Sequence, residues 1–164
     1  MDVYRIAYRL YAQSPLDGEG SFLFGGRWSS PGTRVAYAST TLTLAMTEFL
    51  AHVDWRDVDP ETPPELVYVT ATLPDHGALT LETLGVALPD GWDDVPAPAD
   101  DAVIGDAWAR GAHSLALLVP SVHIPLGVPE RNVLLNPLHP DFHVVRWTAN
   151  PFEYDRRLLT VRRV

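Results

Sequence analysis

Short β-prone segments run through most of the chain, and only two stretches have the apolar spacing of a helix. The two helical stretches do not alternate with the strands, so the pattern does not indicate the βαβ units of a parallel sheet. It predicts an α+β fold, in which a mostly antiparallel, twisted sheet is flanked by helices. The expected strands lie within residues 3–11, 34–39, 65–73, 114–121, 131–142 and 143–154.

The two expected helices have recognisable ends. The first begins after Thr40 or Thr41, either of which can serve as the N-cap, and continues for about thirteen residues. The second covers 99–111, because a glycine commonly ends a helix. Residues 13–21 are expected to form a loop, and the acidic, proline-rich stretch 74–101 a surface excursion. The chain of 164 residues is long enough for one well-packed domain, which is expected to span all of it.

Composition excludes several classes of site. The chain has no cysteine, so disulfide frameworks, thiolate metal sites and cysteine nucleophiles are excluded, and a cytoplasmic location is expected. All twelve basic residues are arginines, which removes lysine Schiff-base chemistry. The net charge of −9 argues against a broad nucleic-acid interface, although one or two arginines can still hold a small anion. No apolar run is long enough to span a membrane.

Arg27 is the first candidate site residue, because it follows a double glycine, Gly25 and Gly26, and precedes Trp28. Glycines allow a ligand to approach the backbone closely, and an arginine there can bind a phosphate or carboxylate through two hydrogen bonds. The alternative is a surface arginine that stacks on Trp28 or pairs with one of the many acidic residues.

Glu48 is the second candidate. It lies at the edge of the apolar face of the first expected helix, where partial burial could perturb its pKa. The alternative is an ordinary surface carboxylate. His52 follows at i+4, and an ordinary Glu–His helix pair is the favoured interpretation of that spacing.

Tyr37 lies within the expected strand 34–39, and Ser121 stands at the end of the expected strand 114–121. Tyr37 is either a core tyrosine or a ring that stacks on a planar ligand. Ser121 is either a turn residue or a polar group that lines a pocket, and it lacks the Gly-x-Ser-x-Gly context of a hydrolase nucleophile. His139 and His143 have i, i+4 spacing, but Pro140 and the extended residues that follow argue against a metal site, so none is expected.

Taken in order, five segments of the chain resemble the RES domain, the toxin half of bacterial RES–Xre toxin–antitoxin pairs. The resemblance covers nearly the whole chain and is specific because the five segments occur together and in order. At one position, Ser29 replaces the asparagine that is usual in the family. The segments are YRIA, DGEGSFLFGGRWSSPGTRVAYAS, LTLAMTEFLAHV, VPSVHIPLGVPERNVLLNPLHPDF and FEYDRRL.

The resemblance implies a fold similar to ADP-ribosyltransferases and an activity on NAD⁺ as substrate, with no other cofactor. The arginine, glutamate and serine of the family name correspond to Arg27, Glu48 and Ser121. By this resemblance Arg27 holds a phosphate, Tyr37 stacks near the nicotinamide, and Glu48 stabilises the oxocarbenium-like ribose. Ser121 binds the ligand or orients Glu48.

The resemblance also implies partners and leaves several points open. An Xre-like antitoxin is the expected partner, and a homodimer is also expected. The acceptor could be water, phosphate as a co-substrate, or a protein that becomes ADP-ribosylated. An inactive NAD-binding or partner-binding module is a further alternative, and the net charge opposes an RNA-cleaving toxin. The sequence does not assign roles to Arg9 and Asn136.

Overall fold

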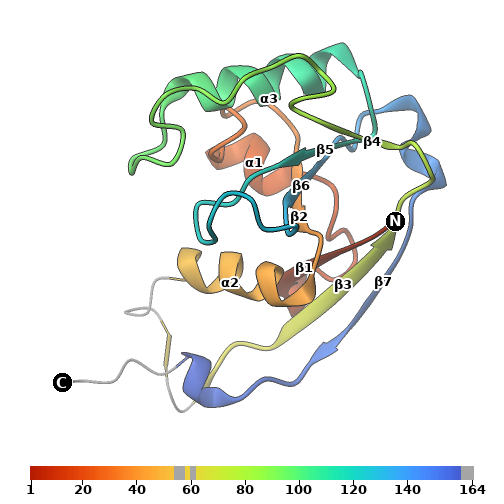
Figure 1. The fold of residues 1–164 in the computed structure, drawn as a ribbon. Coiled ribbons are helices and arrows are strands. Elements are labelled where there is room, and N and C mark those ends of the chain that lie inside the picture. The colour runs from red at the N-terminus through yellow and green to blue at the C-terminus, as the bar shows by residue number, and fades with distance from the viewer. Residues whose placement is uncertain (54–57, 60–61, 160–164) are drawn as a thin grey trace.

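A seven-stranded sheet forms the centre of the computed structural model, which describes residues 1–53, 58–59 and 62–159 (Figure 1). The strand order is β4-β5-β6-β2-β1-β3-β7, and every neighbouring pair is antiparallel except the parallel pair β4 and β5. This sheet confirms the predicted α+β class. The strands are β1 (Asp2–Tyr8), β2 (Ala36–Ser39), β3 (Leu66–Thr72), β4 (Ala78–Thr80), β5 (Ala116–Val119), β6 (Asn132–Leu135) and β7 (Arg146–Phe152).

Three α-helices and three short 3-10 helices complete the described fold. Both predicted helices are present, and the first begins after Thr41, whose side chain accepts a hydrogen bond from the Leu44 N–H (3.2 Å) as an N-cap does. The α-helices are α1 (Glu19–Phe24), α2 (Leu42–His52) and α3 (Ala99–Gly111), and the 3-10 helices are η1 (Arg9–Tyr11), η2 (Pro140–Val144) and η3 (Arg156–Leu159).

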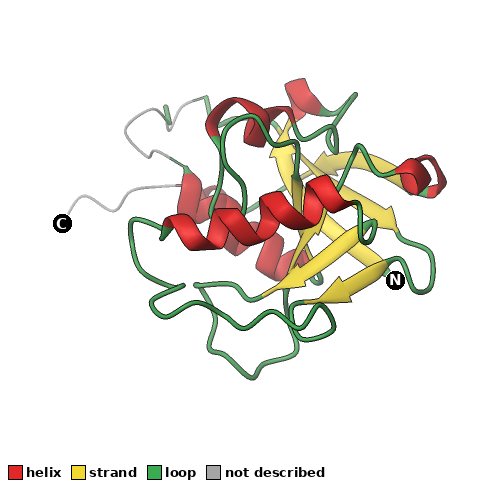
Figure 2. Ribbon diagram, turned by 90° about the horizontal axis from the view of Figure 1, so that it is seen from above, coloured by secondary structure: helices red, strands yellow, loops and turns green. Residues whose placement is uncertain are grey.

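Helices α2 and α3 lie on the same face of the sheet, but over different halves of it. The α2 residues Ala45 and Met46 pack with Ile6 of β1, whereas Trp108 of α3 packs with Leu117 of β5. Figure 2 shows α3 in front of the strands when the molecule is seen from above. In Figure 1 the loop between β5 and β6 lies between the two helices. This loop therefore separates α2 from α3 on that face.

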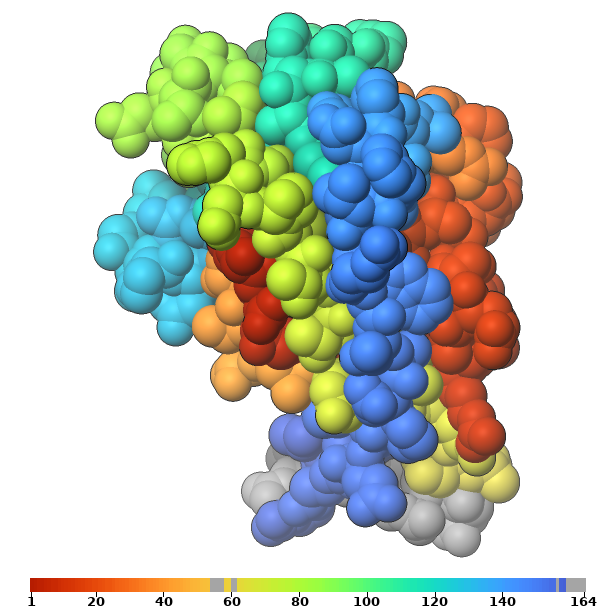
Figure 3. Space-filling view, turned by 90° about the vertical axis from the view of Figure 1, so that its right-hand side faces the viewer, coloured from red at the N-terminus to blue at the C-terminus, as the bar shows by residue number. Residues whose placement is uncertain are grey.

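The opposite face of the sheet is covered by smaller elements. Val3, Ala38 and Val69 point to this side and pack with Leu16, which follows η1, and with Val145, which follows η2. Strands β3 and β7 run side by side along the surface in Figure 3, and β7 is one edge of the sheet. Within the residues that the structure describes, no helix has the length and apolar character needed to cross a membrane.

Two predicted boundaries were wrong. Helix α1 begins inside the segment predicted as a loop, and β4 lies inside the predicted surface excursion. Helix α1 has only six residues, too few to show a periodic pattern, and Phe24 at its end is exposed. It is held by the buried Ser21, whose hydroxyl donates to Thr33 O (2.9 Å) and accepts from the Val35 N–H (2.7 Å). Such long-range contacts are not visible in a local sequence pattern.

Candidate functional site

The carboxylate of Glu48 lies at the centre of the polar contacts between α2 and the two ends of the β5–β6 connection. Its Oε1 accepts one hydrogen bond from Ser121 Oγ and another from Asn132 Nδ2, both at 2.6 Å. Its Oε2 lies 3.5 Å from Nε2 of His123. The side chain keeps 22% of its surface exposed, so the carboxylate is held in place without being sealed off from ligands.

The neighbouring strands orient the two donors to Glu48. Asn132 is the first residue of β6 and pairs in register with Ser39, the last residue of β2. The Ser39 hydroxyl donates to Asn132 Oδ1 (3.0 Å), which turns the amide nitrogen toward Glu48. Ser121 Oγ accepts the backbone N–H of His123 (3.0 Å), so its own proton is available to the carboxylate. Both contacts direct a donor at Oε1 of Glu48.

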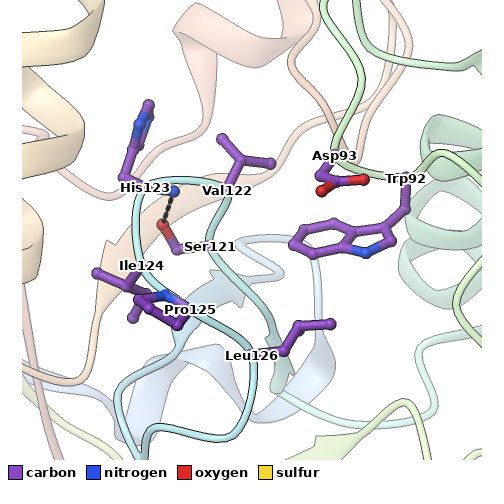
Figure 4. Close-up of a pocket in the computed structure, with 8 residues that line it drawn as sticks. All are labelled: Trp92, Asp93, Ser121, Val122, His123, Ile124, Pro125 and Leu126. Carbon is purple, nitrogen blue, oxygen red and sulfur yellow. Dashed lines mark hydrogen bonds between the residues drawn. The ribbon is translucent and has the colours of Figure 1, made fainter.

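A hollow of about 330 Å³ opens beside these groups. Figure 4 shows Trp92 and Asp93 on one side and the loop that begins at Ser121 on the other. Ser121 and His123, which both contact Glu48, are part of the lining. The volume is at the lower end of the range for small-molecule sites. The hollow is lined by Trp92, Asp93, Ser121, Val122, His123, Ile124, Pro125 and Leu126.

Arg27 is bound to the segment that carries the Trp92 side of the hollow. Its Nη1 donates to Trp92 O and lies 3.3 Å from the carboxylate of Asp101, and its Nη2 donates to Asp94 O (3.0 Å). Trp92 in turn stacks on Trp28, with ring centroids 6.5 Å apart. Three of the five N–H groups of the guanidinium are thus directed at protein acceptors. Arg27 fixes one wall of the hollow.

Asp101 is the buried partner of Arg27. Its side chain has no exposed surface, and its Oδ1 has no hydrogen-bond partner among the described residues. Burial raises the pKa of Asp101, and the hydrogen bond from Arg27 opposes that shift. Arg27 thus donates to two backbone carbonyls, those of Trp92 and Asp94, in addition to the Asp101 carboxylate.

The family model of the RES domain matches residues 2–156. The chain belongs to the RES domain family. Two curated relatives are both named Toxin Res. The one from Yersinia enterocolitica is 35% identical over 96% of this chain and 99% of its own length, and the one from Photorhabdus laumondii is 32% identical over 99% and 100%.

Two further proteins are similar to this RES protein. A Sphingobium protein named Prs ADP-ribosylating toxin is 34% identical over 92% of this chain and 91% of its own length. The crystal structure of the Mycobacterium tuberculosis MbcT–MbcA toxin–antitoxin complex contains a chain with a TM-score of 0.60. That match covers 96% of this chain and 86% of the other at 18% identity, so it shows a shared fold.

The RES protein brings Glu48 and Ser121 together, whereas Arg27 lies in the turn after α1 and Tyr37 lies in β2. Glu48 and Ser121 form a direct hydrogen bond, whereas the hydrogen bonds of Arg27 and Tyr37 run to other groups. Among the described residues, neither a hydrogen bond nor an ion pair joins Glu48 to His52, so the predicted helix pair was wrong. The histidine beside the carboxylate is His123 instead.

Several residues of the site were not found from the sequence. Asn132 and His123 carry no motif of their own, and only their place at the ends of the β5–β6 connection brings them to Glu48. Arg9 pairs with Glu65 on the surface (3.0 Å), and Asn136 donates to Ala109 O (2.9 Å), so both have structural contacts elsewhere. In the described part of the chain, no group of three or more acidic or histidine side chains could hold a metal ion.

The hydroxyl of Tyr37 organises the glycine-rich turn. It accepts the backbone N–H of Trp28 (3.1 Å) and shares a hydrogen bond with Ser29 Oγ (2.9 Å). A Cβ on Gly26 would lie 2.6 Å from this hydroxyl, which explains the glycine there without a ligand. Ser29, which replaces the usual asparagine of the family, is 1% exposed. Its short side chain fits between Tyr37 and the turn.

Replacing Tyr37 by phenylalanine is expected to lower the free energy of unfolding by about 1–3 kcal/mol, because Trp28 N–H and Ser29 Oγ lose their partner. Urea unfolding at pH 7 measures the change. The exposed Tyr11 is the matched control, and its phenylalanine variant is expected to stay within about 0.5 kcal/mol of the wild type. Equal stability of the two variants would contradict a structural role for the Tyr37 hydroxyl.

The same hydroxyl predicts a pH dependence at the alkaline end. Burial raises the pKa of Tyr37 to about 12, whereas an unfolded tyrosine ionises near pH 10. Between these values the unfolded chain has released a proton that the folded chain retains, so stability falls as the pH rises. Urea unfolding at pH 9 and pH 11 is expected to show a larger loss for the wild type than for Tyr37→Phe. An identical loss in both would contradict the raised pKa.

Proposed function

We propose that this RES protein is the toxin of a toxin–antitoxin pair and that it cleaves NAD⁺ at the bond between nicotinamide and ribose. The observation that carries the proposal is the Glu48 carboxylate, whose Oε1 is held by two 2.6 Å hydrogen bonds beside an open hollow. A fixed negative charge at such a place can stabilise the positive charge that develops when a glycosidic C–N bond breaks. The Toxin Res relatives support the biological role.

In the proposed reaction, the nicotinamide leaves as a neutral molecule with the electron pair of the C–N bond. The ribose carbon becomes oxocarbenium-like, and Glu48 stabilises it through Oε2, the oxygen that Ser121 and Asn132 do not occupy. Water then adds to that carbon and loses one proton to the solvent, or phosphate adds through one of its oxygens. Ser121 acts by orienting Glu48, which is one of the two roles expected from the sequence.

Arg27 is proposed to contribute to phosphate binding with the N–H groups that its protein acceptors leave available. Three of its N–H groups point to Trp92, Asp94 and Asp101. The remaining two can donate to one oxygen of the diphosphate. On this proposal Arg27 has two tasks, because it holds the wall of the hollow and contacts the substrate. Tyr37 supports the turn that carries Arg27.

A second candidate function is ADP-ribosylation of a protein, and the observation that favours it is the 34% identical Sphingobium relative named Prs ADP-ribosylating toxin. The two reactions share the first step, in which nicotinamide departs, and differ only in the acceptor. An antitoxin partner is proposed for both, because the structurally similar M. tuberculosis chain was solved in a toxin–antitoxin complex.

Expression in bacteria tests the proposal and separates the candidates. Induction of the wild-type chain is expected to arrest growth and to lower cellular NAD⁺ within minutes while the RNA stays intact. A small loss of NAD⁺ together with a newly labelled protein band, when a tagged NAD⁺ analogue is supplied, would favour ADP-ribosylation. Growth arrest with unchanged NAD⁺ and no labelled protein would overturn both.

A further inference from the structure

The two oxygens of the Glu48 carboxylate have different surroundings. Oε1 accepts from Ser121 Oγ and Asn132 Nδ2, whereas Oε2 faces Nε2 of His123 at 3.5 Å. In the described part of the chain, His123 is the one basic side chain that forms an ion-pair contact with the Glu48 carboxylate. Because Oε1 already accepts two hydrogen bonds, Oε2 is the oxygen that can act on the substrate. The orientation of Oε2 therefore depends on its neighbour, His123.

His123 is well placed to control that oxygen. Its backbone N–H donates to the hydroxyl of Ser121 (3.0 Å), so the loop that carries the histidine also carries the donor to Oε1. The side chain of His123 lines the hollow and is 29% exposed (Figure 4). His123 thus contacts the catalytic groups twice, since its backbone N–H binds Ser121 and its ring lies beside Oε2 of Glu48.

We propose that His123 is a positioning residue that holds Oε2 of Glu48 toward the bound ribose. This inference rests on the proposed function, in which Glu48 stabilises the oxocarbenium-like ribose. Ser121 and Asn132 hold one oxygen, but the carboxylate can still turn about the axis through that oxygen. The imidazole Nε2 lies 3.5 Å from Oε2, and an N–H donated across this distance as the site tightens around substrate would remove the freedom. Small displacements of a catalytic group can change a rate strongly.

A positioning role for His123 predicts a change in kcat, whereas a role in substrate binding would change KM. Replacing His123 by leucine is expected to lower kcat for nicotinamide release by about 10–100-fold and to change KM by less than about threefold. Glutamine places an amide N–H near the position of Nε2, so His123→Gln is expected to recover most of the lost kcat. His52→Leu is the matched control, because His52 is exposed, lies one turn from Glu48 on α2, and forms neither a hydrogen bond nor an ion pair with it among the described residues. It is expected to retain the wild-type rate.

Steady-state nicotinamide release by the four purified full-length proteins tests the inference, with thermal unfolding to compare their folding. Loss of kcat in His123→Leu, recovery in His123→Gln and a normal rate in His52→Leu would support it. Full kcat in His123→Leu, equal losses in both His123 variants, or a change confined to KM would overturn it while the proposed function stands. If His123→Leu does not fold, the glutamine variant decides: near-normal kcat supports the inference, and a loss of tenfold or more overturns it. A wild type that releases no nicotinamide would overturn the inference and the proposed function together.

Discussion

Replacing Glu48 by glutamine is expected to lower the rate of nicotinamide release from NAD⁺ by about 10²–10⁴-fold. The amide has almost the shape of the carboxylate but lacks its charge, so it cannot stabilise a cationic ribose. This range corresponds to roughly 3–5 kcal/mol of transition-state stabilisation. The change is expected in kcat more than in KM, because the charge matters when the bond breaks. Stopped assays that quantify free nicotinamide by chromatography measure it.

Two further variants show whether the loss of activity in Glu48→Gln comes from the Glu48 site itself. Glu82→Gln is the matched control, because Glu82 is an exposed glutamate outside the hollow, and its variant is expected to keep the wild-type rate. Ser121→Ala is expected to fall between the wild type and Glu48→Gln, because it removes one of the two donors to Oε1. A Glu48→Gln protein that is folded and as active as Glu82→Gln would contradict the role of the carboxylate.

The second large effect concerns stability. A methyl group on Gly105 would lie 1.8 Å from the backbone oxygen of Trp28, so Gly105→Ala forces α3 away from the turn that carries Arg27. The expected loss is about 3 kcal/mol or more, since neither backbone can yield without disturbing its neighbours. The midpoint of thermal unfolding should then fall by roughly 6–12 °C. Differential scanning calorimetry measures it.

Gly20→Ala is the control for the Gly105 variant. Gly20 lies in α1, and a methyl group there would have no heavy atom within 4 Å. Because alanine favours the helix, this change is expected to leave stability equal or raise it by up to about 1 kcal/mol. If Gly105→Ala were as stable as Gly20→Ala, the close contact between α3 and the Trp28 turn would be wrong.

Much of the fold was predictable because its elements have local patterns. The apolar spacing of α2 and its threonine cap lie within one short stretch, and the same is true of β3. Helix α1 and β4 were missed because contacts from far along the chain hold them. The hydroxyl of Ser21 binds Thr33 O, and β4 pairs with β5, which lies more than thirty residues later.

The site, like the fold, was predicted only in part. Glu48 and Ser121 were candidates from their places on a helix edge and at a strand end, and the resemblance to RES domains supplied their roles. Their hydrogen bond spans 73 residues and could not be predicted from local pattern. An ion pair of Arg27 with an acidic residue was one of the alternatives from the sequence, but the partner Asp101 was not predictable, because the acceptors of Arg27 come from the stretch that was predicted as a surface excursion. His123 was not predicted to be a site residue, since a histidine two residues after a serine matches no pattern, whereas His52 had the familiar helical spacing.

Cleavage of NAD⁺ at the Glu48 site is tested most directly by proton NMR of NAD⁺ mixed with the purified full-length protein. Free nicotinamide is expected to accumulate far beyond one equivalent per protein with the wild type, and to stay at background with Glu48→Gln. The same spectra, recorded with and without phosphate, identify the other product as ADP-ribose or its 1″-phosphate. If NAD⁺ raises the unfolding temperature of the wild type but no nicotinamide appears, the protein binds the dinucleotide without cleaving it, and the proposed function is wrong.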